Sequence, residues 1–405
     1  MIAVVSPSRL CGSVRVPASK SYAHRLLIAA ALSDAPTRVS INARSRDIDA
    51  TADCLRALGV RVQPLNDAGV QEQGFSVYPL AERMDQPTLF CAESGSTLRF
   101  MLPVAAALGT EATFTGEGRL PERPNEPLIE ALRSHGVTVD RELLPIRLSG
   151  RLTGGDYPIA GNISSQYITG LMLALPLCKE DSHIILTTPL ESAGYLDITR
   201  EVLSLFGVRV EVTPQDFFIP GGQTYNSPQE TAAEGDWSGA AFWLAARRMG
   251  HEVEVNGLNP ESAQGDRAIV EQLTRLGQQI DVSGTPDAVP ALAVAAAMHP
   301  GVTRITGAAR LRIKESDRLR AVSDMLRALG GQVEEQNDGL IIRGGAPLHG
   351  GRVEGYNDHR IVMAAAIAAS MASGPVEITD AQAINKSYPG FFRDFESLGG
   401  NVHVQ

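Results

Sequence analysis

One short pattern recurs six times along this chain of 405 residues, and it constrains the fold more than any other feature. The pattern is a Leu or Phe, three residues, a Gly, two residues and an apolar residue, and it returns roughly every 70 residues. Its glycines are Gly59, Gly136, Gly207, Gly277, Gly330 and Gly399. A helix that ends on a left-handed Gly and leads directly into a strand has such a sequence. The six copies therefore predict six α/β repeats.

Each repeat is expected to hold a second helix that is almost entirely apolar. These stretches are residues 22–32, 98–108, 168–177, 240–248, 289–298 and 361–371. Helices that are apolar on all sides are buried, so we expect these helices inside and strands around them. Three repeats precede residue 230 and three follow it, which indicates two similar halves, with the first strand crossing over to complete the second half. A cleft between two halves is a common place for a ligand.

Composition and charge exclude several classes of protein. With 43% hydrophobic and 20% charged residues, the chain has the composition of a soluble globular protein. Its net charge of −10 argues against coating nucleic acid or an anionic membrane, since both attract basic surfaces. No CxxC pair, HxxxH motif, Walker A loop or GxGxxG loop occurs, so we expect no disulfide scaffold, zinc site or nucleotide site. The start lacks a signal-peptide pattern and no apolar run spans a bilayer, which predicts a cytoplasmic protein.

Lysine is unusually rare in this chain. Only Lys20, Lys179, Lys314 and Lys386 occur among 36 basic residues. Lys179 stands beside Glu180 and resembles an ordinary surface residue, whereas the other three lie among Ser, Asp, Glu or Arg residues. A lysine is a compact charge that can exchange a proton, which an arginine cannot replace, so these three are candidates for chemistry.

Several helix starts carry cations or neutral donors where acidic residues are normally favoured. They lie in segments 19–25, 94–99, 161–167 and 357–360. A proline-stiffened loop at 118–127 adds two arginines, and segment 312–318 combines both signs of charge. A helix N-terminus attracts anions, and Lys, Arg and Ser donors there make a phosphate or carboxylate site, although Ser also caps helices for structural reasons. The sequence predicts a cationic cleft for small polyanions inside an acidic protein.

Eight motifs stand in order along the chain: Lys20-Ser21-Tyr-Ala-His-Arg25, Gly95-Ser-Thr-Leu-Arg99, Arg123-Pro124, Ser164-Ser165-Gln166, Gly235-Asp236, Lys314-Glu315-Ser-Asp-Arg318, Asp358-His359-Arg360 and Lys386-Ser-Tyr-Pro389. Together they resemble the 5-enolpyruvylshikimate-3-phosphate synthase family of enolpyruvyl transferases, over essentially the whole chain. The resemblance implies a two-domain inside-out α/β barrel with three βαβαββ repeats in each domain, helices inside and sheets outside. One domain would be residues 1–17 with 234–405 and the other residues 18–233, with the active site in the interdomain cleft.

The activity implied by this resemblance is transfer of the enolpyruvyl group of phosphoenolpyruvate to the 5-hydroxyl of shikimate 3-phosphate. Phosphate would leave through a tetrahedral intermediate, in the biosynthesis of chorismate and the aromatic amino acids. The resemblance implies small-molecule substrates, no metal, cofactor, nucleic-acid or membrane partner, a monomer, and the inhibitor glyphosate. The chain departs from the common family pattern at Ala18, Glu93, Phe100 and Arg310.

The resemblance also implies roles for individual residues. The catalytic residues would be Lys20, Asp287, Glu315 and Lys386. Shikimate 3-phosphate would be bound by Lys20, Ser21, Arg25, Ser164, Ser165, Gln166, Ser192, Tyr195, Asp287 and Lys314. Phosphoenolpyruvate would be bound by Lys20, Gly95, Arg99, Arg123, Gln166, Arg318, His359, Arg360 and Lys386. Asp287 would lie near the reacting hydroxyl and Glu315 near the enol methylene, because one group must lose a proton while the other gains one.

Two alternatives remain open at this point. One is the enolpyruvyl transferase that uses UDP-N-acetylglucosamine, which resembles a Lys-Asn pair where Lys20-Ser21 stands and a Cys in the loop at 119–127. The other is a non-enzymatic ring protein of pseudo-sixfold symmetry, such as a DNA clamp, which six α/β repeats would also suit. A ring protein would not explain lysines placed among Ser, Asp and Glu at helix starts.

Overall fold

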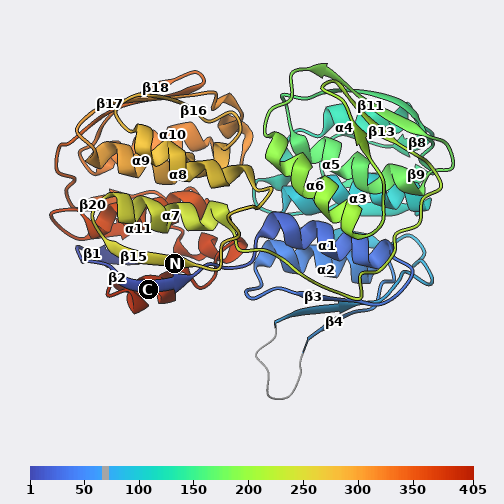
Figure 1. Cartoon of the computed structure of the whole chain (residues 1–405), viewed down its shortest axis with the longest axis horizontal. Helices are drawn as coiled ribbons and strands as arrows, with labels where there is room; N and C mark the ends of the chain where they lie inside the picture. Colours follow the sequence, from blue (N-terminus) through green and yellow to red (C-terminus); the bar gives the residue numbers. More distant parts are fainter. Residues whose placement is uncertain (66–72) are drawn as a thin grey trace. The chain divides into compact units, whose positions relative to one another are not determined.

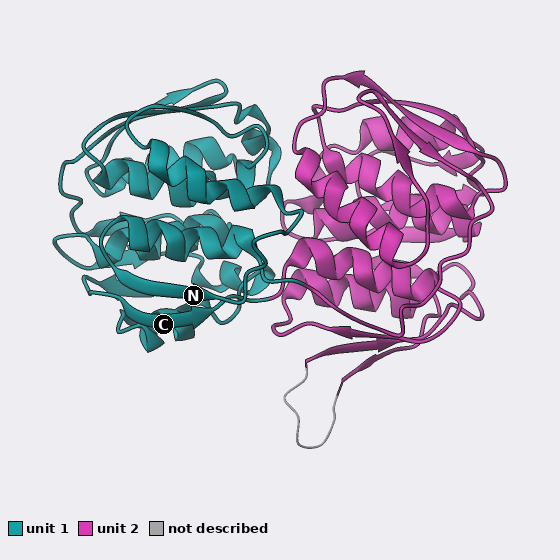
Figure 2. Ribbon diagram, in the orientation of Figure 1, with its two compact units in different colours: residues 1–17, 234–405 teal, residues 18–233 magenta. Residues whose placement is uncertain are grey.

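The computed structural model describes residues 1–65 and 73–405. The chain divides into two compact units, shown in teal and magenta in Figure 2. Unit 1 comprises Met1–Pro17 and Glu234–Gln405, and unit 2 comprises Ala18–Ala233. The chain therefore leaves unit 1 after its first strands and returns to it later.

Unit 2 consists of short strands and six α-helices within its described residues. The helices are α1 Lys20–Leu32, α2 Arg46–Ala57, α3 Gly95–Leu108, α4 Glu126–Arg133, α5 Ser165–Ala174 and α6 Ala193–Leu205, with 3-10 turns η1 Leu120–Glu122 and η2 Leu175–Leu177. The strands are β3 Thr37–Ser40, β4 Val62–Pro64, β5 Gly74–Val77, β6 Thr88–Phe90, β7 Ala112–Thr115, β8 Val137–Val139, β9 Ile146–Gly150, β10 Gly155–Ala160, β11 Ser182–Thr188, β12 Glu211–Val212, β13 Asp216–Ile219 and β14 Glu230–Ala232.

Unit 1 has the same kinds of element. Its helices are α7 Trp237–Arg248, α8 Ile269–Gln272, α9 Val289–Met298, α10 Arg318–Ala328, α11 His359–Ser370 and α12 Phe391–Ser397, with 3-10 turns η3 Gly265–Ala268, η4 Leu273–Arg275, η5 Pro286–Ala288, η6 Ala309–Ile313 and η7 Ala381–Lys386. Its strands are β1 Ala3–Ser6, β2 Cys11–Arg15, β15 Glu252–Asn256, β16 Gln279–Asp281, β17 Gly301–Thr306, β18 Gln332–Gln336, β19 Gly339–Gly344, β20 Gly351–Val353, β21 Val376–Ile378 and β22 Asn401–Val404.

The strands of the described residues form six sheets, three in each unit. Five of these sheets share one pairing pattern, a parallel pair followed by two antiparallel neighbours. The orders are β14-β3-β5-β4, β6-β7-β9-β8 and β10-β11-β13-β12 in unit 2, and β16-β17-β19-β18 and β20-β21-β1-β22 in unit 1. The sixth sheet is the parallel pair β2–β15. This recurrence confirms that the chain is built from α/β repeats.

Two sheets include a strand that is distant in sequence. β1 lies between β21 and β22, with Ala3 opposite both Ile378 and Val404, so the first strand of the chain completes the sheet of the last repeat. β14 pairs in parallel with β3, although almost the whole of unit 2 separates them in sequence. Unit 1 consists of two segments, Met1–Pro17 and Glu234–Gln405. A 2.9 Å hydrogen bond from Asp236 N to Pro17 O joins the start of the second segment to the end of the first.

The six repeat glycines all have left-handed backbone, with φ from +75° at Gly207 to +106° at Gly59. Residues with a Cβ adopt this conformation at a cost, which is why glycine recurs at these helix ends. The interpretation of the glycines as helix stops is confirmed.

Two predicted helices differ from the structure. In the fourth repeat the segment before Gly277 is broken into η3, α8 and η4 instead of one amphipathic helix. There the Leu273 carbonyl accepts a hydrogen bond from the Arg248 side chain, and the chain tightens into a 3-10 turn. The helix predicted to reach residue 177 ends as α-helix at Ala174, because Pro176 has no N–H to continue the pattern.

The apolar helices form the interior of each unit. All twelve residues of α11 are buried, as are nine of the ten in α9. In unit 1 the helices α7 to α11 lie between β16–β18 on one side and β1, β2 and β15 on the other (Figure 1). The predicted fold class, with helices inside and sheets outside, is confirmed. Within residues 1–65 and 73–405, no helix has the length and apolar content needed to cross a membrane.

We predict that Gly59→Ala destabilises the protein more than Gly222→Ala in the same unit. Both glycines have positive φ, which costs an alanine about 1–2 kcal/mol. A Cβ at Gly59 would also lie 2.3 Å from the Glu82 carbonyl oxygen, whereas one at Gly222 would meet nothing within 4 Å. We expect about 1–3 kcal/mol of additional loss at Gly59, measured by urea unfolding. Equal losses would show that the Glu82 backbone moves aside freely.

Candidate active site

The start of α1 in unit 2 holds the first of the rare lysines. Lys20 is the first residue of the helix, and its Nζ lies 2.7 Å from Asp47 Oδ2 in the first turn of α2. The Lys20 side chain is 17% exposed, so the ammonium is partly accessible. The first turn of α1 contains no acidic residue, as the sequence indicated. The lysine is thus held at a helix N-terminus by an acid from the neighbouring helix.

Arg25, one turn further along α1, is buried without a carboxylate partner among the described residues. Its guanidinium donates to Thr199 Oγ1, Thr169 Oγ1 and the carbonyls of Ser21 and Tyr195, at 2.6–3.1 Å. Burial lowers its pKa to about 9, although nearby tyrosines raise it. A cation surrounded only by neutral groups interacts favourably with an added anion.

The starts of α3 and α5 are joined by Gln166. Its Oε1 accepts from Arg99 Nη1 at 2.5 Å, and its Nε2 donates to Ser96 Oγ at 2.9 Å. Arg99 also donates to Asn125 Oδ1 and to the Pro124 carbonyl. The Gln166 amide, at the start of α5, therefore fixes the buried Arg99 side chain at the start of α3.

Arg123, from the proline-stiffened loop, lies over the first residue of α3. A Cβ placed on Gly95 would lie 2.6 Å from Arg123 Nη1, so the guanidinium packs directly on this glycine. Arg123 is only 6% exposed and its Nε is buried. Among residues 1–65 and 73–405, no hydrogen bond or ion pair satisfies this guanidinium. A buried cation of this kind is strongly attracted to an anion.

Serines cap the helices around these arginines. Ser94 and Ser164 accept from the backbone N–H groups of Thr97 and Gln166 at the starts of α3 and α5. Ser192, in left-handed backbone, precedes α6. The other predicted serines and the tyrosine lie at the same helix ends: Ser21, Ser165 and Tyr195. Neutral caps leave the positive N-terminal ends of these helices uncompensated.

A chain of hydrogen bonds that the sequence did not reveal links α1, α2 and α3. His24 Nδ1 is 2.7 Å from Thr51 Oγ1, which is 2.7 Å from Thr97 Oγ1, which donates to Ser94 Oγ. Burial and the charges of Lys20 and Arg25 hold the pKa of His24 well below its ordinary value, so the ring is neutral. This chain fixes the start of α3 relative to α1. Only the juxtaposition of three helices creates it, so no local pattern could have shown it.

Arg318 is the centre of the charge cluster in unit 1. Its side chain is 1% exposed and donates to Asp358 Oδ2 at 2.9 Å, Asp287 Oδ1 at 2.8 Å and Glu315 Oε2 at 2.6 Å. Burial lowers the pKa of this guanidinium, but the three carboxylates raise it by more than burial lowers it. The pKa of Arg318 is therefore above its ordinary value. The arginine is therefore fully charged and rigidly held.

Asp287, in η5, is surrounded by cations. Arg318 Nη1, Arg360 Nη2 and Lys314 Nζ lie 2.8, 3.3 and 3.8 Å from its carboxylate. Burial acts to raise the pKa of Asp287, but Arg360, Lys314 and Arg318 together hold it well below its ordinary value. Asp287 is therefore an anion with three cations beside it.

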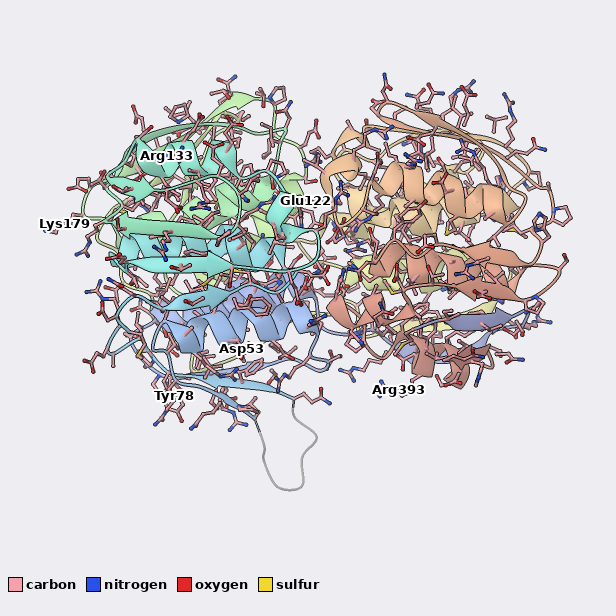
Figure 3. The ribbon with its side chains drawn as sticks, turned by 180° about the vertical axis from the view of Figure 1, so that it is seen from behind. Asp53, Tyr78, Glu122, Arg133, Lys179 and Arg393 are labelled. Carbon is pink, nitrogen blue, oxygen red and sulfur yellow. The ribbon has the colours of Figure 1, made fainter. Side chains whose placement is uncertain are left out.

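The start of α11 brings the remaining predicted residues together. Asp358 caps the helix by accepting from Arg360 N at 3.0 Å, and His359 Nδ1 lies 3.9 Å from the same carboxylate. Lys386 Nζ donates to the Asn357 carbonyl at 2.6 Å, just before the helix. Lys386 is 4% exposed. Three of the four lysines, Lys20, Lys314 and Lys386, thus contact other residues at or near the predicted sites. Lys179 is instead exposed on the surface of unit 2 (Figure 3).

The predicted site residues thus form two groups, one in each unit. Unit 2 holds Lys20, Ser21, Arg25, Gly95, Arg99, Arg123, Ser164, Ser165, Gln166, Ser192 and Tyr195, and unit 1 holds Asp287, Lys314, Glu315, Arg318, His359, Arg360 and Lys386. Unit 1 caps its helices with Asp236, Asp317 and Asp358, in contrast to the serines of unit 2. Within the part of the chain that the structure describes, no group of three His, Cys, Asp or Glu side chains could hold a metal ion.

Sequence reasoning missed two acids, Asp47, which pairs with Lys20, and the buried Asp266. Asp358 lay within a recognised motif but was given no role. Asp266 accepts a hydrogen bond from Ser238. No charge pattern around it distinguishes it from a surface residue, so only its burial in the fold reveals it.

Comparison with solved structures places the fold among the enolpyruvyl transferases. The EPSP synthase of Acinetobacter baumannii matches with a TM-score of 0.81 and 24% identity, covering 100% of both chains. The enolpyruvyl transferase NikO of Streptomyces tendae matches with a TM-score of 0.80 and 19% identity, over 99% of this chain and 98% of the other. At such identities the likeness shows the fold alone.

Sequence relatives define the family. The model of EPSP synthase (3-phosphoshikimate 1-carboxyvinyltransferase) matches residues 4–284 and 276–395. The 3-phosphoshikimate 1-carboxyvinyltransferase of Clostridium kluyveri is 42% identical, over 98% of this chain and 97% of its own length. That of Clostridioides difficile is 39% identical, with the same coverage. The chain belongs to the EPSP synthase family, which confirms the resemblance found in its motifs.

We predict that Arg318→Met destabilises the protein by about 3–5 kcal/mol, because it leaves the buried Asp358 and the partly buried Asp287 and Glu315 without their shared cation. Arg320→Met, two residues along α10, is the matched control. Arg320 is 70% exposed and 3.6 Å from Asp324, so its loss should cost less than about 1 kcal/mol. Chemical unfolding of both variants measures the difference. Similar losses would show that other donors replace Arg318.

Proposed function

We propose that this protein transfers the enolpyruvyl group of phosphoenolpyruvate to the 5-hydroxyl of shikimate 3-phosphate and releases phosphate. The observation that carries the proposal is Arg123, a buried guanidinium packed on Gly95 with no protein partner among the described residues. Its place in the family's motif corresponds to phosphoenolpyruvate binding. Family membership favours this function over the UDP-sugar transferase and over a non-enzymatic ring.

Binding of the substrates would use both units. The buried cations of unit 2, Arg25, Arg99 and Arg123, would bind phosphate and carboxylate groups together with Lys20. The cations around Asp287 would bind the same pair of molecules from unit 1. Holding two anions side by side supplies much of the rate, because the reaction then needs no further encounter.

The chemistry requires two proton transfers. In the addition step, the 5-oxygen bonds to C2 of phosphoenolpyruvate while the hydroxyl loses a proton and C3 gains one. In the elimination step, the C2–O bond to phosphate breaks and C3 gives up a proton. Asp287 would act at the hydroxyl and Glu315 at C3, while Lys20 and Lys386 stabilise the departing phosphate.

The surroundings of Asp287 explain how it could gain basicity at the right moment. Arg360, Lys314 and Arg318 hold its pKa low in the substrate-free protein. Substrate anions on these cations would offset their effect and raise the pKa of Asp287 towards that of a useful base. The carboxylate would thus become a proton acceptor only when the substrates are bound.

Cytoplasmic location and a monomeric state belong to the same proposal.

The direct test is phosphate release by the purified protein. We expect release only when shikimate 3-phosphate and phosphoenolpyruvate are both present, followed with a colorimetric phosphate assay. Each substrate alone serves as the control. Release with UDP-N-acetylglucosamine in place of shikimate 3-phosphate would overturn the proposal.

Gly95→Ala should weaken phosphoenolpyruvate binding. A Cβ at this position would push against the Arg123 guanidinium, and losing one charged hydrogen bond of about 1.5 kcal/mol raises KM about tenfold. KM for shikimate 3-phosphate should stay constant, and glyphosate should inhibit less strongly. Gly374→Ala is the control, since its Cβ would meet neighbours only at 3.7 Å. An unchanged KM for phosphoenolpyruvate would place that substrate elsewhere.

A further inference from the structure

Thr51 is a fully buried residue in the middle of α2, and the proposed mechanism assigns it no role. Its Oγ1 lies 2.7 Å from His24 Nδ1 of α1 and 2.7 Å from Thr97 Oγ1 of α3. Both of these partners are also fully buried, so water does not compete for the two contacts. Thr51 therefore links two helices that carry candidate anion sites at their N-terminal ends.

The hydroxyl groups of this chain can be arranged in only one way. Thr97 Oγ1 donates to Ser94 Oγ at 2.8 Å, with the Asp47 carbonyl as a longer alternative at 3.5 Å. A hydroxyl has a single hydrogen, so Thr97 can only accept from Thr51. For the same reason, Thr51 can only accept from His24.

His24 completes the chain with a proton on Nδ1. Its Nε2 is buried and has no hydrogen-bond partner among the described residues. A proton on Nε2 would therefore lack an acceptor, whereas a proton on Nδ1 has the Thr51 hydroxyl. Both arguments give the same tautomer of the neutral ring, and the chain runs in one direction from His24 to Ser94.

The chain ends at the start of α3. Ser94 is the N-cap of this helix, and its Oγ accepts from Thr97 N at 3.2 Å. The next residue is Gly95, on which the Arg123 guanidinium packs. The last link of the chain thus lies beside two residues that the proposed function assigns to phosphoenolpyruvate.

The other end of the chain, on α1, is held by further contacts. Arg25 of the same helix donates to the Tyr195 carbonyl at 3.0 Å and to the hydroxyls of Thr169 and Thr199. These bonds tie α1 to α5 and α6 without Thr51. Loss of the Thr51 hydroxyl should therefore loosen the start of α3 more than the start of α1.

We propose that Thr51 is a positioning residue for phosphoenolpyruvate: its hydroxyl accepts from His24, donates to Thr97 and so holds the first turn of α3 in the geometry that binds this substrate. This inference rests on the proposed function, which assigns Gly95 and Arg99 to phosphoenolpyruvate. Thr51 is fully buried, so it acts on the substrate only through Thr97.

The main experiment compares the kinetics of phosphate release by the wild type, Thr51→Val and Thr51→Ser. Valine has nearly the shape of threonine and a similar helix propensity, but it forms no hydrogen bond. Loss of one buried hydrogen bond should raise KM for phosphoenolpyruvate about fivefold, with KM for shikimate 3-phosphate unchanged. Thr51→Ser keeps the hydroxyl and should restore the wild-type KM. An unchanged KM for phosphoenolpyruvate in Thr51→Val, or an equal rise in both KM values, overturns the inference.

Thr110 provides a matched control in the same unit. It is buried just beyond the C-terminal end of α3, and its Oγ1 has no hydrogen-bond partner in the part of the chain that the structure describes. Thr110→Val should therefore keep both KM values. A similar rise in KM for phosphoenolpyruvate would show that loss of any buried hydroxyl has this effect, against the inference.

Thr97→Val breaks the chain one link further on and tests whether Thr51 acts through Thr97. The double variant Thr51→Val/Thr97→Val should then have the same KM for phosphoenolpyruvate as Thr97→Val alone. A KM raised by the product of the two single effects would show that the two residues act independently, and would overturn the inference.

Nuclear magnetic resonance of the wild type tests the direction of the chain and needs no variant, so it also serves if Thr51→Val does not fold. The 15N chemical shifts of the His24 ring distinguish a protonated nitrogen from an unprotonated one. We expect the proton on Nδ1, and a proton on Nε2 would overturn the inference.

The same assays separate this inference from the proposed function. If the wild type releases no phosphate from the two substrates, the proposed function fails. If it does and Thr51→Val has the wild-type KM for phosphoenolpyruvate, only the role of Thr51 fails.

Discussion

Burying positive charge is costly unless partners surround it, and the structure balances its buried arginines in two different ways. In unit 1, three carboxylates from Asp287, Glu315 and Asp358 surround Arg318. In unit 2, Arg25 is held by hydroxyl and carbonyl oxygens and by an aromatic ring, without an acid among the described residues. In unit 1 the carboxylates neutralise the charge of Arg318. In unit 2 the charge of Arg25 is not neutralised by an acid among the described residues, so it can attract an added anion.

The difference extends to the helix ends. Aspartates cap α7, α10 and α11 in unit 1, whereas serines precede α1, α3, α5 and α6 in unit 2. Ser94 and Ser164 satisfy backbone N–H groups of α3 and α5 without cancelling the helix dipole, and neither first turn contains an acid, so these two N-terminal ends keep their attraction for anions. Phe100 stands where the family commonly has another residue. The centre of its ring lies 4.9 Å from the Arg25 guanidinium carbon, so the ring stabilises this buried cation without neutralising its charge. If the proposed function is correct, the cations that contribute to the stability of this protein also bind its substrates.

Local patterns explain what the sequence could predict. Gly59 and Gly207 mark helix ends because only a residue without a Cβ adopts their backbone cheaply, and that requirement is visible in a short stretch of sequence. Lys20 and Arg99 were recognisable because cations at helix starts break a local charge rule. The fold class therefore followed from the sequence, and the residues of the proposed site were predicted from it.

Contacts between distant residues could not be predicted in this way. Arg318 and Asp358 are 40 residues apart, and Gln166 and Ser96 are 70 apart, so no periodicity links them. The broken helix of the fourth repeat depends on a side chain from α7, which propensity alone does not reveal. Asp266 has the same explanation, since an aspartate in a polar segment is ordinarily exposed and only the packing of η3 on α7 buries it.

The central claim is that the buried cations of both units bind one pair of anionic substrates. A crystal structure of the protein with shikimate 3-phosphate and a non-reactive analogue of phosphoenolpyruvate would test it most directly. The account predicts that Arg123 and Arg99 of unit 2 and Arg360 and Lys386 of unit 1 all lie within hydrogen-bond distance of the analogue. An analogue bound by residues of one unit alone, with Arg123 still without an anionic partner, would contradict it.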